Sequence, residues 1–584
     1  MKWARLLASW FILSSVFGLR IERAVADSIE QAQKYNVNSF YDYAGAASLY
    51  STLRAIGTHG YFYVDDRYWS YMTPAQQTSF IISLQQLSQQ FDDAIYPASV
   101  KLWGSEANPG VDGDSHVVIL LQRLINGSGG YFENIHNYSK EQSPLGNARE
   151  MLFINADSVL AGNAKTLIAH ELQHLISFNQ RELAGRMDED VWLNEARSEY
   201  NTTAVGYGGP TEFSSLQRRV VGFLRAPSDS LTVWPNTSTD YAITSIFAHY
   251  LVGHYGEAIL SETGSSKYSG TAALHDWLKT NKNSGFSDVF VSWMVANALN
   301  DRGLNSLYGY TQAELSSLRV LPETTESLSL SRKQISRSSR LQEWQPRWLT
   351  IPIESGVTSN QDLTLRISGS SESSLYGAIM MRYRNGFTRV LQSQFTDGRS
   401  DARVPMWDAG SEIQSVTFAV AQGSLYPLER RKPIEETVMI TASIGDLDES
   451  YVSPLTDPIA PTSERFAYVQ PRDGDLIRRK GQSDIYVVWG PYRRLLTPTI
   501  LALYGFQNRE IRDVPDDVFF HYAASVYIRA LGSKKVYAVW ADGSKHWFDI
   551  SAQQWEASGR DWSAIFTVND AEVSAYPLGT SITR

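Results

Sequence analysis

The sequence of 584 residues contains no cysteine. This absence excludes disulfide bonds, thiolate catalysis and zinc sites with thiolate ligands, so each domain must be stabilised by burial of its own core. Apolar runs long enough to cross a membrane are also missing after the amino terminus. The formal net charge of -10 makes nucleic acid an unexpected partner.

The amino terminus has the pattern of a secretory signal. Lys2 and Arg5 precede an apolar run over residues 6–19, and Ala24-Val25-Ala26 has the small-x-small form that signal peptidase cuts. We expect residues 1–26 to be removed and the remainder to be secreted from a bacterium or held at its surface. Charged residues between the run and the cut leave an uncleaved membrane anchor as the alternative.

An HExxH motif, His170-Glu171-Leu172-Gln173-His174, is the most specific feature of the sequence. On a helix, its two histidines lie one turn apart and can bind one metal ion, while the glutamate can take a proton from metal-bound water. The apolar pattern over residues 165–178 favours such a helix. The alternative is a chance occurrence of the motif, with both histidines structural.

A third metal ligand is expected downstream of the motif. Glu195 follows His174 by 21 positions, which leaves room for a loop and a second helix that returns to the metal. Glu199 lies one turn after Glu195 and is expected to accept the outer N–H of a ligating histidine, with a solvated surface charge as the alternative. The sequence therefore predicts one zinc ion held by His170, His174 and Glu195.

These residues resemble the gluzincin metallopeptidases, and within them the hyicolysin-type family. The resemblance covers residues 50–310, and outside the motif it lies in residues 61–66, 91–97, 116–121, 130–132, 150–155, 241–256 and 286–304. It implies an α+β peptidase domain with one zinc ion. Aminopeptidases with this zinc arrangement carry a Gly-x-Met-Glu-Asn segment, and none is found upstream of His170. An endopeptidase is therefore favoured.

In the mechanism that the resemblance implies, zinc-activated water attacks the peptide bond and Glu171 acts as general base. The oxyanion that forms needs a further hydrogen-bond donor, and Tyr241, His249 and His254 are the candidates. Tyr241 is preferred because it begins an amphipathic segment, where its hydroxyl can project toward the substrate. His254 is expected to be structural, at the end of the same helix.

Two less specific signals lie upstream of the motif. Residues 116–121 form an extended segment before the glycine-rich residues 127–130, and both an edge strand that pairs with substrate and an ordinary core strand remain open. Asp112-Gly113-Asp114 has the oxygen density of a calcium loop without the full ligand pattern. A calcium ion at this loop is therefore a second, less supported prediction.

We expect a multidomain chain. Residues 27–340 are predicted to form an α+β zinc metallopeptidase domain that begins with a pro-segment or a first helix over residues 27–51. The Ser- and Arg-rich residues 327–340 lack apolar periodicity, which indicates a linker. Residues 341–446 contain short segments of period two, typical of a β-sandwich. Residues 447–470 are predicted to be a second, proline-containing linker.

An internal repeat follows the second linker. Residues 484–489 return as 535–540 at an offset of 51, and residues 514–522 return as 568–576 at an offset of 54. This predicts two small α+β modules, residues 471–525 and 526–584, similar to tandem modules at the carboxyl ends of bacterial secreted and surface proteins.

Four aromatic residues of these modules have two candidate roles, in the core or as a platform for polysaccharide: Trp489, Tyr492, Trp540 and Trp547. Core packing is the expected role.

The sequence as a whole predicts a secreted zinc endopeptidase that acts on proteins or peptides, with appended modules that contact a cell surface or polysaccharide. Two alternatives remain, namely an adhesive protein with a vestigial or structural peptidase domain and a zinc hydrolase of a non-peptide substrate. Retention of Glu171 argues against the adhesive protein, because this residue is not needed to bind metal. Oligomeric state is not predicted.

Overall fold

The computed structural model describes residues 26–583, except 126–127, 209–214, 358–360, 372–373, 409–410, 425–434, 449–470, 472–473, 490–491, 507–510, 515–517, 520–521, 531–532, 541, 558–559 and 561. The expected signal sequence, up to residue 25, and most of the expected second linker lie outside the described residues. The chain divides into two compact units, one ending at Asn179 and the other beginning at Gln180. No helix in the described part is long and apolar enough to span a membrane.

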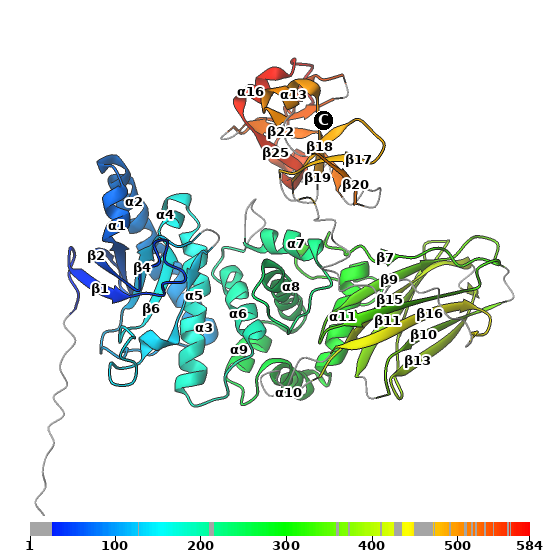
Figure 1. The fold of residues 1–584 in the computed structure, drawn as a ribbon, viewed down its shortest axis with the longest axis horizontal. Coiled ribbons are helices and arrows are strands. Elements are labelled where there is room, and N and C mark those ends of the chain that lie inside the picture. The colour runs from blue at the N-terminus through cyan, green and yellow to red at the C-terminus, as the bar shows by residue number, and fades with distance from the viewer. Residues whose placement is uncertain are drawn as a thin grey trace, which may run out of the picture. The chain divides into compact units, whose positions relative to one another are not determined.

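A six-stranded sheet forms the centre of the first unit (Figure 1). In sheet order its strands are β1 (Ala32–Asn36), β2 (Ser48–Ile56), β3 (Gly60–Asp65), β4 (Val117–Gln122), β6 (Met151–Asn155) and β5 (Gly130–Tyr131). Strands β3, β4 and β6 are parallel, and the others pair antiparallel with their neighbours. Alternate residues of these strands, among them Leu120 and Phe153, form an apolar cluster on one face.

Helices complete the first unit: α1 (Asp66–Tyr71), α2 (Pro74–Gln90), η1 (Phe91–Ile95), α3 (Tyr96–Trp103), η2 (Asn134–Asn137), α4 (Asp157–Ala161) and α5 (Ala164–Phe178). Helix α2 starts where the sequence provides a capping box, since Thr73 and Gln76 bond each other's backbone N–H groups and Pro74 occupies the first turn. Helix α5 packs on β6 and α3. The sheet thereby supports the helix with the HExxH motif.

The first residues of the described chain belong to the sheet. β1 and β2 pair over Ala32–Asn36, and the Asp27 carboxylate accepts hydrogen bonds from Tyr63 and Arg149. The expectation of a first helix over residues 27–51 is therefore wrong, because strands occupy this stretch.

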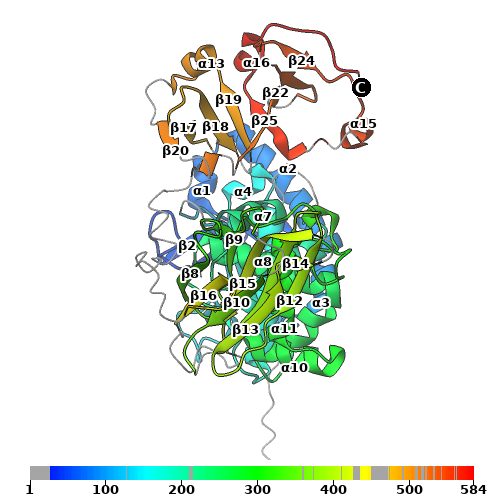
Figure 2. The same ribbon diagram turned by 90° about the vertical axis from the view of Figure 1, so that its right-hand side faces the viewer.

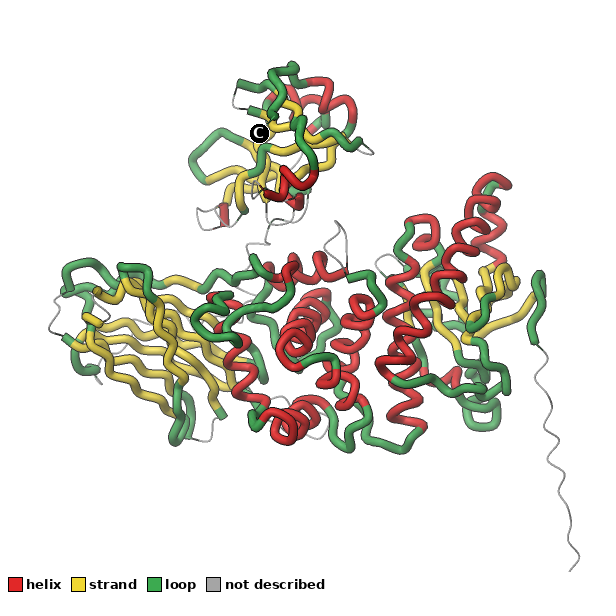
Figure 3. The backbone as a smooth tube through the Cα atoms, turned by 180° about the vertical axis from the view of Figure 1, so that it is seen from behind, coloured by secondary structure: helices red, strands yellow, loops and turns green. Residues whose placement is uncertain are grey.

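Helices dominate the second unit up to residue 299 (Figure 3). Their bounds are η3 (Asn179–Leu183), α6 (Val191–Ala204), α7 (Ser215–Arg225), α8 (Ser238–Tyr255), α9 (Ala258–Gly264), α10 (Gly270–Lys282), α11 (Phe286–Leu299) and, further on, η4 (Ala313–Leu315). Helix α8 packs against α6, α7 and α9 and is buried over most of its length, so it is the central helix of this part.

Two sheets with a shared apolar core follow these helices, which is the architecture of a β-sandwich. One sheet contains β13 (Arg399–Pro405), β10 (Asp362–Ser368), β16 (Glu436–Ile444) and β8 (Gln334–Leu341), in this order. The other contains β12 (Thr388–Gln392), β11 (Leu375–Tyr383), β15 (Ser411–Gln422), β9 (Arg347–Pro352) and β7 (Glu323–Thr324), with β14 (Trp407–Asp408) paired to β15.

The stretch predicted as the first linker is partly a strand of this sandwich. β8 pairs antiparallel with β16, and Ile335 and Leu341 lie in the shared core. The linker expectation was wrong because serines also occupy buried positions of β8, such as Ser336 and Ser339, which hides the apolar period.

The last part of the chain contains two small modules with matching topology (Figure 2). The first consists of β17 (Leu476–Arg479), β18 (Ile485–Trp489), β19 (Tyr492–Leu496), α13 (Pro498–Leu503), β20 (Ile511–Val514) and β21 (Ala523–Ala524). The second consists of β22 (Tyr527–Ala530), β23 (Val536–Val539), β24 (Lys545–Trp547), α15 (Ala552–Ala557), η7 (Trp562–Ala564), β25 (Ile565–Val568) and α16 (Asp570–Ala575).

In each module the first strand lies between a parallel partner and an antiparallel one. Leu476 is paired with Ile511 in one module and Tyr527 with Ile565 in the other, so the equivalent positions differ by 51 and 54 residues. These are the offsets of the sequence repeat.

The two modules also share contacts. A common apolar cluster contains Leu476 and Ile500 of the first module and Phe566 and Val568 of the second. Within the same region, Arg494 donates to the buried carboxylate of Glu572 at 2.6 Å.

Candidate metal centre

Helix α5 places the two motif histidines on one face. The Nε2 atoms of His170 and His174 lie 3.2 Å apart, and the rings are inclined by 75°. Two imidazole nitrogens bound to one zinc ion at about 2.0–2.1 Å with tetrahedral geometry would be about 3.3 Å apart. The separation in this helix therefore suits a shared metal ion. Glu171 lies between the histidines in sequence and is buried.

Helix α6 carries Glu195, the third predicted ligand. Ligand atoms of His170, His174 and Glu195 lie within 4.8 Å of one another, and among the described residues this is the one such group of histidine and acidic side chains that could hold a metal ion. The geometric part of the sequence prediction is confirmed, because two neighbouring imidazoles and a distant carboxylate come together. Two nitrogens and one oxygen form a donor set that zinc accepts.

A buried ionic network fixes the start of α6. The Glu189 carboxylate accepts a hydrogen bond from Arg197 at 2.5 Å and another from the backbone N–H of Gly270 at 2.8 Å. Arg197 also donates to the carbonyl oxygen of Leu260. All of these side chains are almost completely buried, so their hydrogen bonds offset the cost of removing their charges from water. The network holds the helix that carries Glu195.

Glu199, one turn after Glu195, makes a bidentate ion pair. Arg219 of α7 donates to both of its carboxylate oxygens, at 2.7 and 2.6 Å. Burial lowers the pKa of Arg219, but the charges of Glu199, Tyr241 and Glu195 raise it by more, so the net pKa lies above its ordinary value. The positive charge of Arg219 therefore interacts favourably with the carboxylates of Glu199 and Glu195 on α6. The predicted contact of Glu199 with a ligating histidine stays a prediction.

The three candidate oxyanion donors have different environments. Tyr241 lies in the first turn of α8, donates from its hydroxyl to Asn236 Oδ1 at 3.0 Å, and is covered on its ring by the Arg219 guanidinium. His249 is buried, with one ring nitrogen 2.8 Å from the Ser245 carbonyl oxygen and the other 3.0 Å from Thr203 Oγ1. Burial lowers the pKa of His249.

His254, the third candidate, has its Nε2 atom 2.9 Å from the carbonyl oxygen of Gly309. Both histidines are thus engaged in packing contacts of the helical region. Tyr241 is the candidate whose hydroxyl is exposed.

The sheet edge nearest the motif is β5. Gly130 of β5 lies so close to α5 that an added Cβ would be 3.1 Å from Glu171 Cγ and Oε1 and 2.9 Å from the carbonyl oxygen of Phe153. A side chain at this position would displace the glutamate. The sequence showed a glycine-rich turn here, but it did not indicate which glycine approaches Glu171.

Residues 116–121, which the sequence left open as an edge strand or a core strand, belong to a central strand, β4. β4 lies between β3 and β6 and is buried at every residue. Its unbroken apolar run, Val117–Leu121, is typical of a parallel strand covered on both faces. The edge that remains near the motif is β5.

The loop predicted to bind calcium is held by other contacts. The Asp112 carboxylate accepts a hydrogen bond from Arg149, and Asp114 contacts both His116 and Tyr61. Neither aspartate belongs to a group of three ligands among the described residues. The structure therefore gives the calcium prediction no support. Glu150 packs beneath this loop, where its Oε1 accepts the N–H of Val111, and burial raises its pKa to about 7.

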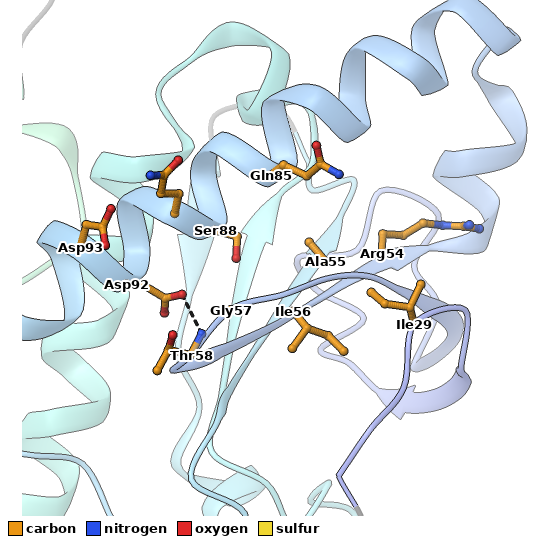
Figure 4. A pocket seen from close by; sticks show the side chains of 11 residues that line it. Ile29, Arg54, Ala55, Ile56, Gly57, Thr58, Gln85, Ser88, Asp92 and Asp93 are labelled. Atoms are coloured by element: carbon orange, nitrogen blue, oxygen red, sulfur yellow. Dashed lines mark hydrogen bonds between the residues drawn. The ribbon is translucent and has the colours of Figure 1, made fainter.

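A surface cavity of about 500 Å³ lies elsewhere in the first unit, between the β2–β3 hairpin and α2 (Figure 4). Its lining includes Arg54, Gln85 and Asp92, and the Asp92 carboxylate accepts the backbone N–H of Thr58 at 2.6 Å. None of the metal-ligand candidates lines this cavity.

Comparison with known proteins identifies no family. No family model matches the chain, and no characterised protein sequence matches it. Among solved structures, the chain is similar to the periplasmic inhibitor of g-type lysozyme, PliG, from Aeromonas hydrophila, at 12% identity over 21% of this chain and 99% of that one. The TM-score of 0.15 is too low to support an inference about fold or function.

Proposed function

We propose that this protein is a zinc-dependent endopeptidase with a gluzincin-like catalytic domain. The observation that supports it most is that ligand atoms of His170, His174 and Glu195 lie close together. Glu171 is buried on α5, the helix that carries the two histidines. A zinc ion held by these three side chains would supply Lewis acidity, which polarises a scissile carbonyl and lowers the pKa of water.

Glu171 is the proposed general base. Its carboxylate accepts a proton from the attacking water and then donates that proton to the nitrogen of the leaving amine. The absence of a side chain at Gly130 leaves room for the carboxylate in this position, since a Cβ there would lie 3.1 Å from Glu171 Oε1. Tyr241 is the proposed donor to the oxyanion, because its hydroxyl is exposed and its ring is held by Arg219.

The proposed substrate is an extended peptide segment within a protein. β5 is the last strand of its sheet, so its outer edge offers backbone groups to which an extended chain could add as a further strand. Such pairing does not require a free amino terminus, which suits an endopeptidase. Secretion through the amino-terminal signal would bring the enzyme to proteins outside the cell or on its surface.

Proteolysis of unfolded casein by residues 27–584 tests the proposal. We expect cleavage that a zinc chelator abolishes and that added zinc restores. Glu171→Gln should lower the rate by at least about a hundredfold, because it removes the base. Glu182→Gln, on an exposed glutamate just beyond the motif helix, is the control and should retain full activity. A zinc-loaded chain that cleaves no peptide bond would instead favour the adhesive alternative.

A further inference from the structure

Two tryptophans occupy equivalent positions in the carboxyl-terminal modules, and both are exposed. Trp489 ends β18 and Trp540 directly follows β23, which is the equivalent strand. Their exposed fractions are 47% and 49%, and neither residue belongs to the apolar clusters of the modules. The expectation that these two tryptophans pack in the cores is therefore wrong.

The other two aromatic candidates are less available. Tyr492 packs against the apolar cluster shared by the modules. The ring of Trp547 is covered by the ammonium group of Lys535, which lies 4.7 Å from the ring centroid. Trp489 and Trp540 are therefore more exposed than Tyr492 and Trp547, which are both half-buried.

One face of the Trp540 indole packs on a buried histidine, His546. The indole lies on the imidazole of His546, with ring centroids 3.6 Å apart and planes inclined by 20°. His546 is almost fully buried, and its two ring nitrogens contact the Thr580 carbonyl oxygen and Ser544 Oγ at 2.8 and 2.7 Å. These contacts hold the indole in one orientation, with one face covered by the imidazole.

Gly579 shows that this support is closely packed. A Cβ at this position would lie 2.3 Å from Cε1 of His546, so only glycine fits against the imidazole. Gly579 ends the stretch Tyr576-Pro577-Leu578-Gly579 near the carboxyl end of the second module. This glycine allows the backbone to pass directly against the imidazole on which Trp540 is stacked.

Polar groups lie in the same turn as Trp540. Ser544 donates from its hydroxyl to Asp542 Oδ1 at 2.6 Å, and this hydrogen bond helps to keep the pKa of Asp542 below its ordinary value. An exposed flat ring beside ionised and hydroxyl oxygens suits a sugar, whose C–H face stacks on the ring and whose hydroxyl groups donate to the oxygens.

The charge of the second module favours a neutral ligand. Residues 526–584 contain six basic and six acidic side chains, so the module has no excess charge to attract a polyanion or a polycation. We propose that the carboxyl-terminal modules bind a neutral polysaccharide, with one sugar ring stacked on Trp540 and another on Trp489. Two linked sites on one polymer would strengthen binding beyond that of either site alone.

Affinity electrophoresis of the full chain tests this proposal. The native gels would contain dissolved hydroxyethylcellulose, laminarin, mannan or dextran, and we expect at least one of them to retard the chain. Trp540→Ala should weaken this binding about tenfold, Trp540→Phe should largely retain it, and the double substitution with Trp489→Ala should abolish it. Trp407→Ala is the matched control, because Trp407 is equally exposed, at 49%, but lies in the sandwich.

Three results would overturn the proposal. One is the absence of retardation by all four polysaccharides, and another is an equal loss of binding in the Trp407 control. The third is unchanged retardation of the double variant. Binding of a decaproline peptide, detected by quenching of tryptophan fluorescence, in the absence of any retardation would identify a peptide site instead. Near-ultraviolet circular dichroism of each variant reports whether the modules remain folded.

Discussion

Arg219 of α7 donates two hydrogen bonds, of 2.7 and 2.6 Å, to the carboxylate of Glu199. Glu199 is buried, and it lies one helical turn from the metal-ligand candidate Glu195. Removal of the guanidinium would leave a buried carboxylate without its cationic partner. The ion pair therefore connects α7 to α6, the helix that carries the candidate ligand Glu195.

Arg219→Met should lower the free energy of unfolding by about 3 kcal/mol, since breaking a buried ion pair on one side leaves the other charge uncompensated. Urea unfolding measures this loss, and hydrogen exchange in α6 and α7 locates it. Arg302→Met changes an exposed arginine outside this ion pair and should alter stability by less than about 0.5 kcal/mol. Equal effects of the two substitutions would contradict the role given to Arg219.

Gly130→Ala should slow peptide hydrolysis about tenfold while zinc remains bound. The new Cβ would meet Glu171 Oε1 at 3.1 Å and the Phe153 carbonyl oxygen at 2.9 Å, so the general base must shift from its position. Initial rates on an internally quenched peptide, with zinc content determined on the same samples, measure the effect. In Gly264→Ala the added Cβ makes only an ordinary contact, at 3.7 Å, and activity should be unchanged. Full activity of Gly130→Ala would show that glycine is not needed at this position to keep Glu171 in place.

Stability should decrease between about pH 4.5 and 7 because of Glu150. Burial raises the pKa of this carboxyl to about 7 from an ordinary value of 4.5. Below pH 4.5 both the folded and unfolded states hold the proton, whereas above it the unfolded state releases the proton first. Folding therefore loses stability as the pH rises toward 7, by about 3 kcal/mol in total.

Glu150→Gln removes this proton linkage, so the variant should be more stable than the natural chain at pH 8 and similar to it at pH 4.5. Urea unfolding at several pH values measures both. Glu354→Gln, at an exposed position, controls for the loss of a surface carboxylate. Parallel stability profiles of the natural chain and the Glu150 variant would show that this carboxyl does not contribute.

The metal-ligand candidates could be predicted because their geometry is mostly local. His170 and His174 are four positions apart on one helix, so helical periodicity alone places them together. Glu195 required only one further assumption, a second helix that returns. Arg219 could not be predicted, because its partner Glu199 lies on another helix and an arginine on a short amphipathic segment has no specific sequence signal.

Strand positions were harder to predict than helix positions. The sequence of β4 indicated a strand, but its central place depends on pairing with β3 and β6, which lie far away in the chain. Trp489 and Trp540 follow apolar strand residues and so fit a core pattern. Both are nevertheless exposed, because the packing of a strand on its core is not described by the periodicity of that strand alone.

Measurement of bound zinc tests directly whether His170, His174 and Glu195 hold a metal ion. The purified chain and its variants would be supplied with zinc, dialysed, and examined by mass spectrometry of the metal. We expect one zinc ion per chain in the natural protein and in Glu171→Gln, and strong loss of zinc in His174→Ala and Glu195→Ala. His254→Ala, which alters a histidine outside the metal centre, should retain zinc. A natural chain that binds no zinc, or a His174→Ala variant that binds it equally well, would show that these three residues do not form a zinc site.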